Sequence, residues 1–132
     1  MATTAEWRAV ADAFSAVIDS GVGEPWVWRG RGLVYAALGE RREAVNDYSQ
    51  ALEKNRNDAE ALRGRAFAYA QLGQAENAAA DCTRGIELKL DTWEMYYLRG
   101  LAYRSLEQHE KSATDFAKAV EKEPRIKSLL PK

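Results

Sequence analysis

The chain has 132 residues, 46% of them hydrophobic and 30% charged, a composition that excludes both a disordered chain and a membrane-spanning one. Its 19 Lys and Arg nearly balance its 20 Asp and Glu, so no global field attracts nucleic acid or an anionic membrane, and we expect neither as a partner. A single cysteine, Cys82, excludes an internal disulfide and a multi-cysteine zinc site, and favours a protein of the reducing cytoplasm.

The first segment, residues 5–19, has apolar residues at helical spacing, with Thr3 or Thr4 as the candidate N-cap. Its charged residues interrupt the continuous apolar core that a signal peptide needs. The residues from Ser20 to Pro25 include two glycines and a proline, so we expect the helix to end there.

The chain that follows repeats itself with a period of 34 residues. The slots that recur in phase hold the same residue type: Tyr35, Tyr69 and Tyr103; Leu38, Leu72 and Leu106; Arg31, Arg65 and Arg99; Asp47, Asp81 and Asp115. We therefore predict three tandem repeats at residues 25–58, 59–92 and 93–126, followed by a short tail at residues 127–132.

Each repeat is predicted to consist of two helices joined by a turn. Both halves have apolar residues at helical spacing, and glycine marks the turn at Gly39 and Gly73 because a helix often ends on a residue with positive φ. Glu107 takes the place of glycine in the third repeat, so we expect the third turn to be the least regular.

The repeat resembles that of the tetratricopeptide-repeat (TPR) family. The residues that carry the resemblance are Trp28, Gly32, Tyr35, Ala44, Tyr48 and Ala51 in the first repeat, and Tyr96, Gly100, Tyr103, Phe116, Ala119 and Pro124 in the third. The resemblance implies an all-α fold, a right-handed α-solenoid of three helix–turn–helix repeats forming a single domain. Arg31, Arg65 and Arg99 depart from the pattern, which has leucine there, as do Arg56 and Leu90, which replace its late proline.

The apolar faces of the first and last repeats need a further segment to bury them, because each repeat of a solenoid buries its face against a neighbour. Phe14 precedes Tyr48 by 34 residues, so we expect residues 1–24 to supply a capping helix, in the second-helix slot of an incomplete repeat, and a linker. At the other end, one turn containing Ile126, Leu129 and Leu130 is expected to pack on the last repeat; otherwise that face is open to a partner or a second copy.

The recurring arginines and aspartates have two interpretations. Paired between the helices, they would form a ladder that satisfies partly buried guanidinium groups. The alternative is that Arg31, Arg65 and Arg99 contact a ligand. We favour the structural interpretation because the two residue types recur in step.

The resemblance to TPR proteins also implies a concave groove lined by the first helices. Its candidate partner-binding residues here are Trp26, Arg29, Leu33, Arg63, Phe67, Tyr97, Leu101 and Arg104. The arginines suit acidic side chains and the aromatic residues suit apolar ones. Phe67 and Leu101 have an alternative place in the core, and Trp28 is expected to pack there.

One known TPR site, the clamp for chaperone-tail carboxylates, is not expected here. Of the clamp's positions only Arg29 keeps the chemistry, and Glu94 would repel a carboxylate. No catalytic, metal or cofactor site is expected either, because His109 has no matched acid or nucleophile and Cys82 has no paired base.

The sequence therefore predicts a non-enzymatic adaptor that binds a protein or peptide segment in its groove. The alternative is a scaffold element that associates with itself through its open C-terminal face.

Overall fold

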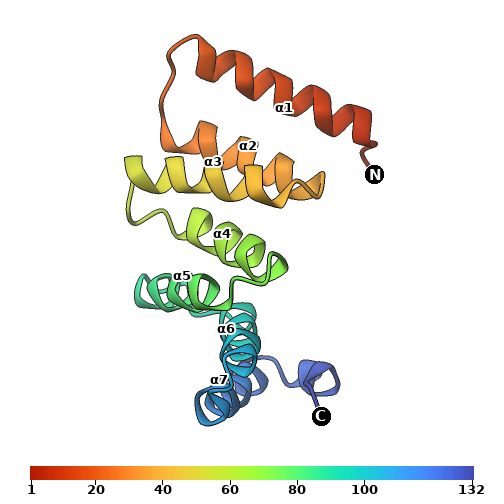
Figure 1. Ribbon diagram of the computed structural model, residues 1–132, viewed down its shortest axis with the longest axis vertical. Helices are drawn as coiled ribbons and strands as arrows, with labels where there is room; N and C mark the ends of the chain where they lie inside the picture. The colour runs from red at the N-terminus through yellow and green to blue at the C-terminus, as the bar shows by residue number, and fades with distance from the viewer.

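The computed structural model describes all residues, 1–132, and is entirely helical. Its elements are α1 (Thr4–Asp19), α2 (Pro25–Ala37), α3 (Arg41–Lys54), α4 (Ala59–Gln71), α5 (Ala75–Glu87), α6 (Trp93–Ser105), α7 (His109–Lys122) and the 3₁₀-helix η1 (Pro124–Leu129). Figure 1 shows the helices stacked in chain order along the long axis, with the two termini at opposite ends of the stack. This arrangement confirms the all-α solenoid predicted from the repeat.

Contacts between helices show which surface is the inner one. Each helix packs on the next, and in addition α2 contacts α4 and α4 contacts α6. The second helices, α3, α5 and α7, do not contact one another. Because elements on the inside of a curved stack lie closer together, the first helices of the repeats form the concave surface.

The N-terminal helix begins and packs as its sequence predicts. Thr3 is the N-cap, and it forms a capping box with Glu6 in which each residue's side chain accepts from the other's backbone NH. Phe14 lies against Gly30, where a Cβ atom would come within 2.5 Å of its ring, just as Tyr48 lies against Gly64 one repeat later. The expected second-helix slot of α1 is therefore confirmed.

The third turn does not differ from the first two, so the expectation of an irregular turn is wrong. Glu107 adopts a φ of 59°, in the same left-handed region as Gly39 at 78° and Gly73 at 76°. The closing hydrogen bond has the same length in the second and third turns, 2.9 Å from the NH of Gln74 to Tyr69 O and from the NH of Gln108 to Tyr103 O. The turn tolerates a side chain because no neighbouring atom lies within 4 Å of a Cβ built at the two glycines.

The arginine and aspartate ladder is confirmed between the two helices of every repeat. Arg31 donates from Nε and Nη2 to the two carboxylate oxygens of Asp47 at 2.7 and 2.8 Å, and Arg65–Asp81 and Arg99–Asp115 have the same geometry. The hydrogen bond to aspartate raises the pKa of each arginine above its usual value, although burial acts in the opposite direction.

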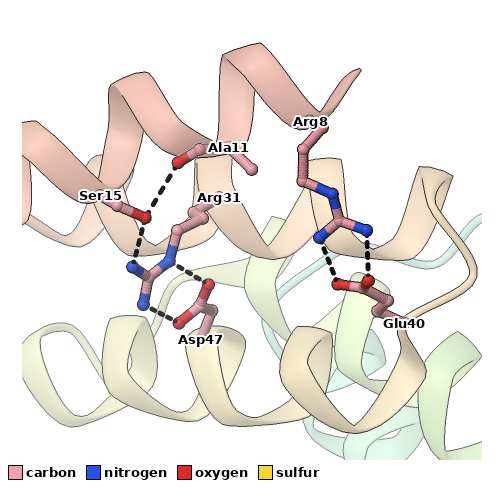
Figure 2. A network of polar contacts seen from close by, with 6 residues as sticks. All are labelled: Arg8, Ala11, Ser15, Arg31, Glu40 and Asp47. Atoms are coloured by element: carbon pink, nitrogen blue, oxygen red, sulfur yellow. Dashed lines mark hydrogen bonds and ion pairs between the residues drawn. The ribbon is translucent and has the colours of Figure 1, made fainter. Parts of the chain in front are cut away.

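Each arginine also reaches the preceding repeat, a contact that the sequence interpretation missed. Nη1 of Arg31 donates to Ser15 Oγ on α1 at 3.0 Å (Figure 2), and Ser15 in turn donates to the carbonyl of Ala11. Ser49 and Thr83 accept in the same way from Arg65 and Arg99, both at 3.0 Å. The 34-residue spacing of these three hydroxyl residues was the available signal. Each guanidinium thus joins three consecutive helices.

The remaining core is built largely from alanine and other small residues, which let the helix backbones approach closely. Cys82 is one of its members and is fully buried beside Met95 and Leu98, as expected for a small hydrophobic residue. Burial raises the pKa of the Cys82 thiol to about 12.

The C-terminal segment packs only in part as expected. Ile126 is buried, at 4% exposed, but the side chain of Leu129 is 59% exposed. Only the backbone of Leu129 engages the last repeat, where its carbonyl accepts from Tyr97 Oη at 3.4 Å.

We expect the ladder to be essential for stability. Arg65→Ala or Asp81→Ala should each lower the free energy of unfolding by about 2–4 kcal/mol, because each leaves a buried charge without its partner. The double variant should lose less than the sum of the two, which chemical denaturation will measure. Arg63→Ala is the control: it removes only an exposed ion pair with Glu60 and should cost less than about 1 kcal/mol. A ladder variant no less stable than this control would contradict a structural role.

Cys82 should resist alkylation as long as the chain is folded. At pH 8 the folded thiol is buried and almost wholly protonated, so iodoacetamide should react on the order of a hundred times more slowly than with the chain unfolded in guanidinium chloride. Mass spectrometry of timed samples gives both rates. Equal rates in the two states would show that Cys82 is accessible.

Candidate partner-binding groove

A groove lies on the concave surface between α2 and α4. Its volume is about 510 Å³, within the range of ligand-binding pockets. Five of the eight predicted site residues line it: Trp26, Arg29, Leu33, Arg63 and Phe67. The structure therefore brings together the candidates from the first two repeats.

The apolar residues of the groove are unusually exposed. Trp26 is 53%, Leu33 61% and Phe67 41% exposed, which rules out a core position for Phe67. Trp28, two residues after Trp26, instead packs against the first core cluster, because neighbouring helical positions face different directions. An exposed cluster of large apolar side chains is typical of an interaction surface.

Two glycines and a tyrosine form the floor of the groove. Gly30 and Gly64 both line it. A Cβ atom at Gly64 would overlap the ring of Tyr48, and one at Gly30 would overlap the ring of Phe14 on α1. Tyr48 is 2% exposed, and burial raises its pKa to about 12, so the hydroxyl keeps its proton. The sequence predicted Tyr48 only as a residue of the repeat pattern; it also lines the groove, and its hydroxyl makes no hydrogen bond within the protein.

The two arginines of the groove are already paired. Arg29 Nη1 donates to Asp58 Oδ2 at 2.6 Å, and Arg63 Nη2 donates to Glu60 Oε2 at 3.0 Å. Asp58 is only 5% exposed, and its other oxygen accepts from the NH of Ala61, which caps α4.

The candidates from the third repeat lie elsewhere. Tyr97 packs against Trp93 and Phe116, with ring centroids 6.2 and 5.9 Å away, and its hydroxyl meets the C-terminal segment. Leu101 lines a separate cavity of about 150 Å³ between α4 and α6, and exposed Arg104 lines neither cavity. The cavity between α2 and α4 therefore does not include the three candidates from the third repeat.

The one histidine of the chain lies at the surface, away from the groove. His109 begins α7 in a shallow surface depression with Gln108, Glu110 and Lys111. No group of three or more His, Cys, Asp or Glu side chains is placed to hold a metal ion. None of the helices combines the length and the apolar character that crossing a bilayer requires.

Comparison with known proteins places this geometry in a family. A family model described as TPR repeat matches residues 32–73, and another described as tetratricopeptide repeat matches residues 94–125. No curated protein matches the sequence.

Solved structures of TPR proteins share the fold. YrrB, described as a TPR protein with an unusual peptide-binding site, is 23% identical with a TM-score of 0.82, over 89% of this chain and 61% of its own. The first TPR of Spaghetti (RPAP3), bound to the HSP90 peptide SRMEEVD, is 25% identical with a TM-score of 0.71, over 79% of this chain and 86% of its own. The TPR domain of Arabidopsis OM64 is 29% identical with a TM-score of 0.73, over the same shares of the two chains.

The matches to both family models fall on the repeats seen in the sequence and in the helices. With the paired helices and the solenoid neighbours, they identify the chain as a member of the tetratricopeptide-repeat family.

Proposed function

We propose that the protein is a non-catalytic interaction module that binds a protein or peptide segment in the groove between α2 and α4. The observation that carries this proposal is the exposure of Trp26, Leu33 and Phe67 around one concave surface. Leaving these side chains in water costs free energy, and a partner that covers them recovers it.

The comparisons support binding of a peptide by this kind of fold. The first and second TPRs of Spaghetti (RPAP3) are bound to an HSP90 peptide, and YrrB is described as having a peptide-binding site. The contacts that we propose for this chain lie on α2 and α4. Tyr97, Leu101 and Arg104 would contribute only to a separate surface on the third repeat.

We further propose that the protein acts as an adaptor in the cytoplasm. A reducing compartment suits its one cysteine, which is buried and unpaired. An adaptor needs no reaction centre, only a rigid surface that a partner recognises, and the repeat scaffold supplies such a surface.

Groove variants test the main proposal. Peptides selected from a displayed library on the wild-type protein should bind the variant Leu33→Ala/Phe67→Ala at least tenfold more weakly in fluorescence anisotropy, because both substitutions remove apolar contact area. Val22→Ala, an exposed apolar residue in the loop before α2, is the matched control and should leave the affinity unchanged. If the double variant binds the selected peptides as tightly as the wild type, the groove is not the binding site.

A second candidate function is self-association through the C-terminal face. The observation that favours it is the exposure of Leu129, the last residue of η1. Light scattering should show the apparent mass rising with concentration, and Leu129→Glu should restore the monomer mass. A monomer mass at every concentration would exclude this function.

A further inference from the structure

We propose that the segment held in the groove is apolar and presents no carboxylate to Arg29 or Arg63. This inference rests on the proposed function and specifies its partner. It departs from the expectation, based on sequence alone, that these arginines recognise acidic side chains, and it follows from the charges that surround them.

Arg29 is already paired with a buried carboxylate. Its guanidinium is 2.6 Å from Asp58 Oδ2, and the Asp58 side chain is only 3% exposed. The same carboxylate accepts from the NH of Ala61 and caps α4. A ligand carboxylate that took Arg29 for itself would leave Asp58 charged, buried and without its cation, which is unfavourable.

Arg63 is also paired with a carboxylate. Glu60, one helical turn before Arg63, pairs with it at 3.0 Å. The two arginines of the groove are thus matched by two carboxylates, Asp58 and Glu60, and the local net charge is zero. An acidic segment would lose the water around its carboxylates on binding and would meet no net positive potential in return. An uncharged segment has no such charges to dehydrate.

The other residues that line the groove are uncharged. The walls offer the exposed apolar surfaces of Trp26, Leu33 and Phe67. The floor offers the hydroxyl of Tyr48, which has no partner within the protein and can hydrogen-bond a peptide group of the bound segment. Apolar walls with one neutral polar group match an apolar peptide.

The groove therefore differs in charge from one built for an acidic peptide. The first TPR of Spaghetti (RPAP3) is bound to the peptide SRMEEVD, which carries three acidic side chains. We expect the wild-type protein to bind this peptide at least tenfold more weakly than it binds apolar peptides selected from a library that contains both uncharged and charged sequences.

A charge-change experiment tests the inference. Asp58→Asn with Glu60→Gln takes the groove from zero to two positive charges, and asparagine still caps a helix well. This variant should bind SRMEEVD about tenfold or more tightly than the wild type, and the gain should shrink as salt is added. Glu60→Gln alone, a change on the surface that cannot disturb the cap, should give a smaller gain in the same direction.

Two controls separate the groove from a general charge effect. Glu53→Gln with Glu87→Gln makes the same change in net charge at exposed sites outside the groove, and it should give no gain. Tyr48→Phe should weaken the selected apolar peptides several-fold while leaving the thermal unfolding midpoint nearly unchanged.

The outcomes distinguish this inference from the proposed function. If the selected library peptides are rich in Asp and Glu and bind through Leu33 and Phe67, the proposed function stands and this inference is overturned. No gain in SRMEEVD affinity for the folded Asp58→Asn/Glu60→Gln variant over the control pair would also overturn it. A library that yields no peptide dependent on Leu33 and Phe67 contradicts the proposed function itself.

Discussion

The bidentate ion pair between the two helices of each repeat is the interaction on which the rest of the structure depends. A partly buried guanidinium needs hydrogen-bond partners, and here one aspartate and one hydroxyl accept from all three of its nitrogen atoms. The aspartate lies on the second helix of the same repeat, and the hydroxyl lies on the preceding repeat. Each arginine therefore helps to set both the angle between the two helices of its repeat and the register, that is, the position of that repeat against the preceding one. Figure 2 shows both contacts converging on Arg31.

This register is what places α2 beside α4. With α3 held behind them by the ladder, the two first helices face the concave side, and the ring of Tyr48 lies against Gly32 of α2 and Gly64 of α4. The groove therefore exists because the repeats pack in this way, and Tyr48, which forms part of its floor, is also a residue of the core. Its charge also depends on the scaffold, because Asp58 caps α4 with one oxygen and neutralises Arg29 with the other.

Most of the fold could be predicted from the sequence, but less of the site could. The period of 34 residues places Arg31 and Asp47 in step, and the helical spacing of α1 places Phe14 in phase with Tyr48. The predictions that were wrong concern residues whose conformation or burial depends on the atoms around them. Glu107 was expected to disturb its turn, yet the space around that turn is open and the left-handed conformation is accommodated. Leu129 was expected to pack, yet the short 3₁₀-helix leaves it in solvent.

The sequence by itself determined the repeat, the helices and the ladder, because each of these is specified by residue types that recur at fixed spacing and are copied in every unit. Tertiary structure alone decided how far the groove extends and what charge it has. Arg29 and Asp58 are 29 residues apart and not in phase, so no repetition links them, and their pairing follows only from how α2 and α4 meet. In the same way Tyr97 occupies a groove position in the repeat, but its hydroxyl meets the C-terminal segment, and the cavity between α2 and α4 does not include it.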